Sequence, residues 1–137
     1  FAFTQGGKVE NEILIKAGAK ELVPGNHAYD APGGKGDVAR YPAIMEPLLQ
    51  KNPDVSLLAA NLDVSAYPQY ERILKPYSVR TVKADGVEHK VATIGLTTEE
   101  GAIEGLKYID AAQAAEKAIR ELNAQGVRII NIHSHLG

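Results

Sequence analysis

The chain has 137 residues, of which 45% are hydrophobic and 23% charged, so it is long enough to bury a core and its composition argues against wholesale disorder. Its formal net charge of −2 gives no broad electrostatic reason to expect nucleic acid or an anionic membrane as a partner. Cysteine is absent, which excludes disulfides, thiolate metal ligands and cysteine nucleophiles. No apolar run reaches the roughly 20 residues that span a bilayer.

The first half of the sequence predicts two helical regions and two strands. Apolar residues at helical spacing in "KVENEILIKAG" predict a helix over 8–18. The run "AKELVP" predicts a short buried strand over 19–24, which leads into the polar loop "GNHAYD". In "DVARYPAIMEPLLQKN", Pro42 and Pro47 predict kinks or two short helical pieces instead of one rod. The continuous apolar run "DVSLLAANL" predicts a central strand over 54–62.

The second half predicts a hairpin, a helix and a final strand. Asp85 and Gly86 lie between the strand-like runs of "KPYSVRTVKADGVEHKVATIGLT", the usual signal for a β-hairpin. The segment 100–109, "EGAIEGLKYI", is expected to be an irregular connection. Asp110 has the chemistry of a helix N-cap, with Gln113 three residues later. The apolar face expected for that helix consists of Ala112, Ala115, Ile119 and Leu122. "VRIINI" then predicts the last strand.

This order of elements predicts an α/β layered domain whose sheet mixes parallel and antiparallel strands. Ligands collect at the carboxyl ends of strands in such sheets. Polar side chains follow three predicted strands at that end: Asn26, His27 and Asp30 after the first, Asn61 and Asp63 after the second, and His133 and His135 after the last. We therefore expect a functional site where these strand ends meet.

The loop "GNHAYD" carries three side chains with metal or proton chemistry. Asn26 can donate its side-chain oxygen to a divalent cation, and His27 can stabilise or protonate a group bound by that cation. Asp30 can orient the His27 ring as a carboxylate partner. The alternative is an Asx-type turn with Tyr29 packed inward, and local chemistry does not separate the two interpretations.

The chain has four histidines, and they are not equivalent. His133 and His135 form an H-x-H pair on an extended segment, which places both rings on one side. That geometry suits a metal, although the motif alone is a weak signal. His89 lies just past the Asp-Gly turn and is expected to be an ordinary surface residue.

The motif "GNHAYD" resembles the Gly-Asn-His-Glu-(Phe/Tyr)-Asp signature of the dinuclear metallophosphoesterases (the calcineurin-like family), particularly its 5'-nucleotidase branch. The likeness continues in the same order through "LLAANLD", "KPYSVRTV…GVEHKVATIGLTT" and "AAEKAIRELNAQGVRIINIHSHLG". The resemblance implies an α/β/β/α layered sandwich with a mixed sheet, incomplete in this chain. It also implies metal-dependent hydrolysis of a phosphoric ester by a metal-activated water, with nucleoside 5'-monophosphates as the first-choice substrates.

The resemblance implies roles for four residues. Asn26 and His135 are expected to be metal ligands, His27 the catalytic histidine that contacts the phosphoryl group, and Asp30 its partner. The implied cofactors are two divalent metal ions (Zn, Mn, Mg, Ca or Fe), only partly ligated by this segment. The family often has a non-ligating residue at the position of His133, so its role stays open.

Other positions depart from the family or support the site. Asn61 and Asp63 are expected to support the site without coordinating metal, and Ala28 stands where the family often has glutamate. The family's Asp-x-His and Gly-Asp motifs, its Gly-His-x-His motif and its C-terminal substrate domain are not found. We therefore expect residues 1–137 to be the central portion of a catalytic domain, the first residue being Phe1 and not Met. The isolated segment is expected to be inactive, or nearly so.

The resemblance also sets expectations about partners and location. A small-molecule phosphate ester and a complementary chain that supplies the missing parts are the expected partners, with no nucleic acid and no membrane span. An extracytoplasmic location (periplasmic, secreted or surface) is implied by the resemblance alone. Two alternatives stay open: a non-catalytic fragment or binding module that keeps the scaffold, or a related hydrolase acting on cyclic nucleotides, pyrophosphates or sulfur esters.

Overall fold

The structure is a computed structural model that describes residues 7–30, 36–100 and 105–136. Its helices are α2 (Lys8–Lys16), α3 (Arg40–Lys51), α4 (Pro68–Glu71) and α5 (Ala111–Ala124). Its strands are β1 (Glu21–Leu22), β2 (Ser56–Leu58), β3 (Leu62–Asp63), β4 (Leu74–Lys75), β5 (Tyr77–Ala84), β6 (Val87–Thr97), β7 (Lys107–Tyr108) and β8 (Ile129–His135).

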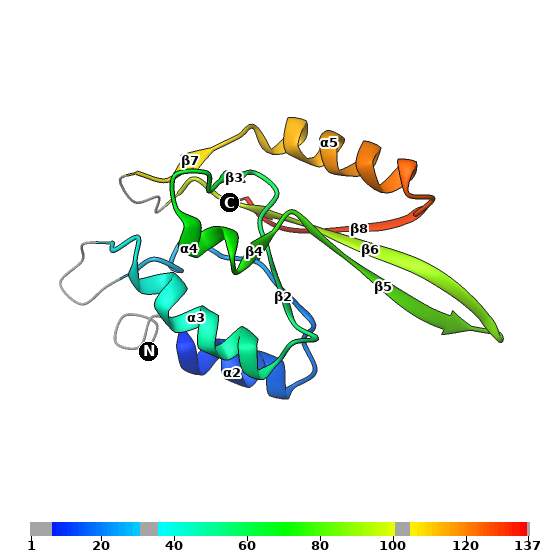
Figure 1. Cartoon of the computed structure of the whole chain (residues 1–137), viewed down its shortest axis with the longest axis horizontal. Helices are drawn as coiled ribbons and strands as arrows, with labels where there is room; N and C mark the ends of the chain where they lie inside the picture. Colours follow the sequence, from blue (N-terminus) through cyan, green and yellow to red (C-terminus); the bar gives the residue numbers. More distant parts are fainter. Residues whose placement is uncertain (1–6, 31–35, 101–104, 137) are drawn as a thin grey trace.

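Two sheets pack together, and helices cover their outer sides (Figure 1). The first sheet has the order β1-β2-β4 and is parallel, whereas the second has the order β5-β6-β8 and mixes antiparallel with parallel pairing. Helices α2 and α3 lie beside the first sheet, and α5 runs along the second (Figure 1). Strands β3 and β7 form a small separate antiparallel pair. The α/β/β/α arrangement with a mixed sheet, predicted from the sequence resemblance, is confirmed.

The first core lies between α3 and the parallel sheet. Tyr41, Met45 and Leu48 recur at helical spacing on α3, so that they form one buried face. They join Leu57 of β2 and Leu74 of β4 in one cluster of buried side chains. The burial of this apolar surface stabilises the half of the domain that carries the "GNHAYD" loop.

The helix predicted over 8–18 is confirmed as α2, but its apolar residues are only partly used. Ile13 and Leu14 are 60% and 49% exposed, while Ile15 packs against the first core. No residue of α2 is fully buried. Helix α2 therefore depends on few apolar contacts within the described part of the chain.

The second core lies between α5 and strand β6. The Asp110 side chain accepts a hydrogen bond of 2.9 Å from the Gln113 amide, so the predicted N-cap is confirmed. The buried face of α5 consists of Ala114, Ala115, Ala118 and Leu122. The prediction that Ala112 belongs to this face is wrong, because Ala112 is exposed. The apolar face that packs on β6 is centred on Ala114 and Ala118 instead. Three of these four buried side chains are alanines, so the packed face of the helix is made mostly of small side chains.

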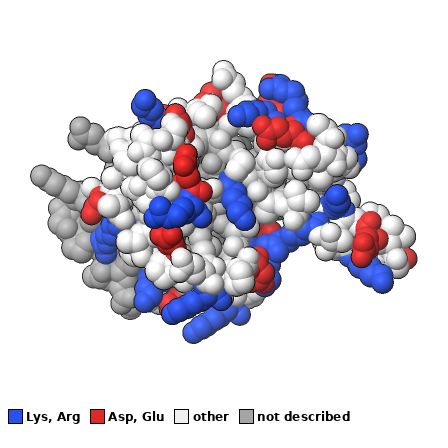
Figure 2. Space-filling model, in the orientation of Figure 1, with Lys and Arg blue, Asp and Glu red and all other residues white. Residues whose placement is uncertain are grey.

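The predicted hairpin is confirmed as β5–β6. Asp85 and Gly86 have φ values of 49° and 80°, and they connect Ala84 with Val87 across a two-residue turn. Positive φ at both central residues matches the twist of antiparallel strands, and glycine adopts it without steric cost. The hairpin projects from the body of the molecule (Figure 1), and its tip carries acidic and basic side chains side by side (Figure 2).

Three other expectations need correction. Arg40–Lys51 is one helix and not two pieces, because Pro42 lies in the first turn, where amides lack intrahelical partners, and Pro47 removes only one internal hydrogen bond. The predicted strand 54–62 is divided into β2 and β3. Segment 100–109 is not wholly irregular, since Lys107–Tyr108 forms β7; its residues 101–104 lie outside the described residues.

The division of the central strand has a visible cause. The Ala59 amide donates to Lys75 in the first sheet, at 2.9 Å, but the Ala60 amide donates to Gly95 in the second, at 2.8 Å. The backbone thus passes from one sheet to the other within two residues, and it pairs with β7 only afterwards. Apolarity identifies the segment as buried but carries no information on which sheet satisfies its amides.

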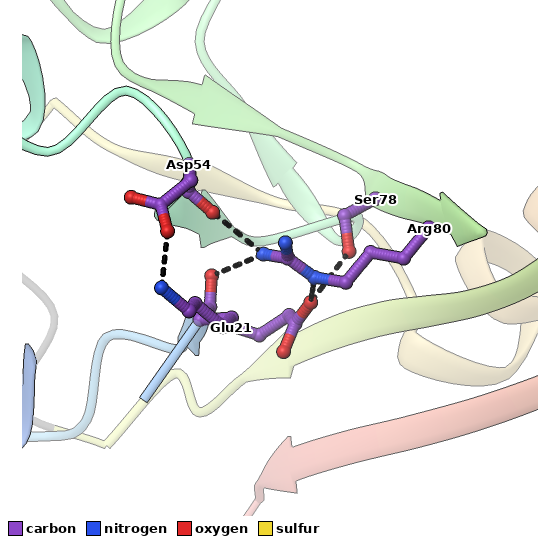
Figure 3. Close-up of polar contacts among 5 residues, drawn as sticks. Glu21, Asp54, Ser78 and Arg80 are labelled. Atoms are coloured by element: carbon purple, nitrogen blue, oxygen red, sulfur yellow. Dashed lines mark hydrogen bonds and ion pairs between the residues drawn. The ribbon is translucent and has the colours of Figure 1, made fainter. Parts of the chain in front are cut away.

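A charged cluster joins the hairpin to the first sheet (Figure 3). The Arg80 guanidinium pairs with the Glu21 carboxylate and donates to the backbone carbonyls of Lys20 and Asp54, at 2.9 and 2.7 Å. Ser78 donates a further hydrogen bond of 3.3 Å to Glu21. Lys20 pairs with the Asp54 side chain, which lowers the pKa of that carboxyl. One arginine therefore connects β5 to the chain beside both β1 and β2.

We expect Arg80→Met to lower the free energy of unfolding by about 2 kcal/mol, the scale of charge-assisted hydrogen bonds. Arg80→Lys should recover little of this loss, because one ammonium group cannot reproduce the planar fork that reaches three acceptors. Urea unfolding of the parent protein, Arg80→Met and Arg80→Lys measures the change in the free energy of unfolding. Arg120→Met is the control, since the Arg120–Glu116 pair is exposed on both sides. Equal losses for the two methionine variants would contradict the expectation.

Candidate active site

The "GNHAYD" loop begins at Gly25, three residues after the end of β1, and hydrogen bonds hold it from within and from α3. Within the loop, the Ala28 amide donates to the Gly25 carbonyl at 3.0 Å, and the Asp30 amide donates to the His27 carbonyl at 3.4 Å. Arg40 of α3 donates to the Asp30 carbonyl at 3.2 Å. Tyr29 is 3% exposed, so the side chain between the polar residues points into the core. The two interpretations of this loop are therefore compatible. Tyr29 packs inward, as expected for a turn, while the polar side chains on either side of it lie at the surface, as expected for a site.

His27 and Asp30 face each other across this turn. His27 Nδ1 lies 2.7 Å from Asp30 Oδ2, with side-chain exposures of 64% and 26%. A carboxylate oxygen accepts hydrogen bonds, so His27 Nδ1 is the donor in this contact. This contact fixes the orientation of the imidazole at the surface of the molecule.

Asn26 and His135 meet although 109 residues separate them in the chain. His135 Nε2 lies 3.2 Å from the side-chain Oδ1 of Asn26. The contact has hydrogen-bond length, and two donors that each lie about 2.1 Å from one divalent cation are about 3.0 Å apart at an octahedral angle and about 3.4 Å apart at a tetrahedral angle. Both atoms belong to donor types that bind such cations. The separation therefore fits two ligands of one metal ion.

The side chains of Asn26, His27 and His135 border a pocket of about 240 Å³, and Tyr41 and Glu10 also line it. One side-chain oxygen of Glu10 is buried and has no hydrogen-bond partner among the described residues. Within the described ranges, no group of three or more His, Cys, Asp or Glu residues could hold a metal ion. A larger cavity of about 470 Å³ runs along α5, but none of the predicted site residues lines it.

The remaining predicted residues lie around this site or away from it. Asn61 is 2% exposed: its Nδ2 donates to the Thr97 carbonyl at 2.8 Å, and its Oδ1 accepts from the Thr97 amide at 2.9 Å. Asp63 accepts from the Ser65 amide, and hydrogen bonds from Ser65 lower the Asp63 pKa. His133 is exposed on β8 opposite Gly95. His89 is paired with Val82 in the projecting hairpin.

Thr97 is the residue of this region that the sequence analysis missed. It is 1% exposed at the end of β6, and its hydroxyl donates to the Pro24 carbonyl at 2.6 Å. A threonine at the end of an apolar strand is common, and no local pattern marks it. Only the packing of three segments around its side chain reveals its position.

Tyrosine rings fill the space beneath the loop. The Tyr29 ring meets Tyr41 edge to face, with centroids 5.3 Å apart, and lies 6.5 Å from Tyr70. Burial raises the pKa of all three hydroxyls, because a desolvated phenolate is unfavourable. The Tyr70 hydroxyl has no hydrogen-bond partner among the described residues. Neutral rings thus anchor the loop to α3 and α4.

This burial predicts a loss of stability in alkali. Below pH 10.0, the ordinary pKa of tyrosine, Tyr41 is protonated in both the folded and unfolded states. Above it, only the unfolded state loses the proton, so the free energy of unfolding falls by up to about 1.4 kcal/mol per pH unit for this residue. We expect Tyr41→Phe to reduce the slope of stability against pH between about 10 and 12. Urea titrations at several pH values measure this slope, and Tyr77→Phe is the control. A Tyr41→Phe slope equal to that of the parent would contradict the prediction.

The fold corresponds to that of part of the metallophosphoesterases. The resemblance to this family, and to its 5'-nucleotidase branch, is confirmed, and the chain has the fold of part of such a protein. No established family profile and no curated protein sequence matches the chain.

Several solved structures do match. A 5'-nucleotidase precursor from Thermus thermophilus is 27% identical with a TM-score of 0.74, and the match covers 98% of this chain but 25% of that one. The NAD nucleotidase of Haemophilus influenzae is 24% identical with a TM-score of 0.63, over 97% of this chain and 22% of its own. The calcineurin-like phosphoesterase YfkN of Bacillus subtilis is 17% identical with a TM-score of 0.62, over 98% and 42%. The chain therefore spans less than half the length of each of these proteins.

Proposed function

We propose that the protein containing this chain hydrolyses phosphoric esters with the help of divalent metal ions, nucleoside 5'-monophosphates being the first substrates to test. The observation that carries the proposal is the 3.2 Å approach of Asn26 Oδ1 and His135 Nε2, beside the His27–Asp30 pair. Similarity to a 5'-nucleotidase precursor over 98% of the chain supports the same reaction class. We also propose an extracytoplasmic location, because the similar Thermus thermophilus protein is named as a precursor.

Four residues of the chain have distinct roles in this proposal. Asn26 and His135 hold a divalent cation, which when bound polarises phosphoryl oxygens and lowers the pKa of a bound water. His27 faces the phosphoryl group and stabilises the charge that develops on its oxygens. Asp30 accepts the hydrogen bond from His27 Nδ1 and thereby holds the ring in one orientation. The exposed position of His27 leaves the site open to a small phosphate ester.

Residues 1–137 are the central portion of the catalytic domain in this proposal. Two metal ions need more ligands than Asn26 and His135 provide, and the described residues contain no cluster of acidic and histidine side chains that adds them. Strand β8 forms an edge of its sheet, and Ile129 and Ile132 are 47% and 48% exposed along it. We propose that further protein, from a longer chain or a complementary one, covers this edge and completes the metal site. No helix in the described ranges has the length and apolarity to cross a membrane.

The test is a Mn²⁺ titration of the full-length protein with an aryl phosphate and with a nucleoside 5'-monophosphate. We expect metal-dependent phosphate release, and loss of metal binding in Asn26→Ala and His135→Ala. His27→Gln should lower kcat by about 10²- to 10⁴-fold while metal binding persists, because this histidine acts on the substrate and not on the metal. His89→Gln, on the distant hairpin, is the control.

The outcomes separate the alternatives. Metal-dependent phosphate release that needs His27 supports the proposal. Metal binding without phosphate release from either ester would favour a binding module, and unchanged turnover in His27→Gln would refute the assignment of that residue.

A further inference from the structure

One buried threonine joins the two halves of the candidate site. The first half is the loop that follows Pro24 and carries Asn26, and the second is the end of β8, which carries His135. Thr97 lies at the last position of β6, between them. Its hydroxyl donates to the Pro24 carbonyl at 2.6 Å, and its backbone is the register partner of His135.

Thr97 is itself held in place on a third side. Its backbone amide donates to Asn61 Oδ1 at 2.9 Å, and its carbonyl accepts from Asn61 Nδ2 at 2.8 Å. Thr97 and Asn61 are 1% and 2% exposed, so these hydrogen bonds are shielded from water. A buried amide that satisfies both backbone groups of one residue leaves that residue little freedom to move.

We propose that Thr97 is a positioning residue, which sets the separation between Asn26 and His135 through its hydroxyl and its place in β6. The inference rests on the proposed function, since it concerns the same pair of donors. Thr97 touches neither donor side chain by a hydrogen bond that the structure shows. It acts through Pro24 on one side and through the β6–β8 ladder on the other.

The hydroxyl can be removed with little change of shape. Valine has nearly the volume of threonine but has a methyl group in place of the hydroxyl, so Thr97→Val leaves the Pro24 carbonyl without its buried donor. The segment from Pro24 to Asn26 is then released from β6, while His135 stays fixed by the ladder. Thr97→Ser keeps the hydroxyl and should restore the native separation.

The experiment uses the full-length protein that contains this chain, the variants Thr97→Val and Thr97→Ser, and Thr93→Val as matched control. Thr93 is a second threonine of β6, 7% exposed, and it pairs with Asn131 away from the loop. The first readout is the Cε1–H signals of the four histidines of this chain, assigned with single His→Gln variants, in metal-free NMR spectra at one fixed pH. We expect Thr97→Val to move the His135 and His27 signals while His89 stays unchanged, and Thr97→Ser and Thr93→Val to resemble the parent.

The second readout is the Mn²⁺ concentration that broadens the His135 signal. Residues that orient metal ligands typically change metal affinity by about 10- to 100-fold when replaced. We expect Thr97→Val to require at least about tenfold more Mn²⁺ than the parent chain, and Thr97→Ser to require the same amount. A loss of stability alone would not give this pattern, because Thr93→Val also removes a buried hydroxyl from β6.

Several results would overturn the inference. Parent-like His135 signals and Mn²⁺ response in Thr97→Val would do so, as would a Thr97→Ser variant that behaves like Thr97→Val. If Thr97→Val does not fold, Thr97→Ala replaces it in the same comparison. If Mn²⁺ broadens no histidine signal even in the parent chain, the metal-binding proposal fails for this segment, and the metal-free spectra still decide the role of Thr97.

Discussion

Gly95→Ala should be among the most destabilising single substitutions in this chain. A Cβ at position 95 would lie 2.5 Å from the carbonyl oxygen and 2.6 Å from the carbonyl carbon of Leu58, distances that real Cβ atoms essentially never show. The obstacle is backbone, so no side-chain rotation relieves it. Separating the sheets would also strain the 2.8 Å hydrogen bond from the Ala60 amide to Gly95.

We expect a loss of about 3 kcal/mol in the free energy of unfolding, at the upper end for overpacking and a large share of the stability of a small domain. Urea unfolding measures it. Gly18→Ala is the control, because Gly18 has a φ of 102° with no atom within 4 Å of a built Cβ. That substitution is strained only by its own backbone and should cost about 1 kcal/mol. A Gly95→Ala loss no larger than the Gly18→Ala loss would show that the two sheets can move apart at little cost.

Gly25→Ala, unlike Gly95→Ala, should leave the free energy of unfolding nearly unchanged and alter the candidate site. A Cβ at position 25 would lie 2.9 Å from Cε1 of His135, and 3.1 and 3.2 Å from its two ring nitrogens. Here the obstacle is an exposed imidazole that can rotate away from its place beside Asn26. The ring should therefore leave its position 3.2 Å from Asn26 Oδ1.

We expect Gly25→Ala to weaken Mn²⁺ binding by at least about tenfold and to lower the free energy of unfolding by less than about 1 kcal/mol. Metal titration and urea unfolding of the same preparations give the two numbers. Ala28→Ser, in the same loop, is a control that should leave both nearly unchanged. Native metal affinity in Gly25→Ala would mean that His135 does not act from its position against Gly25.

Local chemistry was enough for the elements whose signals are short in range. The Asp85–Gly86 turn depends on the φ preferences of two residues, and the Asp110 cap depends on a side chain that reaches an amide three residues later. These interactions form within one segment, so neighbouring residues contain all the information that specifies them. The same holds for α2 as a helix, although not for how little of it is buried.

Elements that depend on distant partners were placed less well. The run over 54–62 is apolar throughout, yet it divides where Ala60 turns to Gly95 of the other sheet. Pro42 and Pro47 fit within one helix, because the position of each proline in the turn matters more than its presence. Small β7 exists only because Leu62 and Asp63 lie beside it.

For the candidate site, the sequence by itself determined the chemistry: an amide oxygen, imidazoles and a carboxylate at the ends of predicted strands, in a motif that resembles a metallophosphoesterase signature. Only the tertiary structure decided that His135 meets Asn26, that His133 lies opposite Gly95, and that Thr97 stands between the two donors. The physical reason is range. Donor chemistry belongs to individual residues, whereas a separation of 3.2 Å between atoms 109 residues apart is set by sheet register and by the close contact between the two sheets.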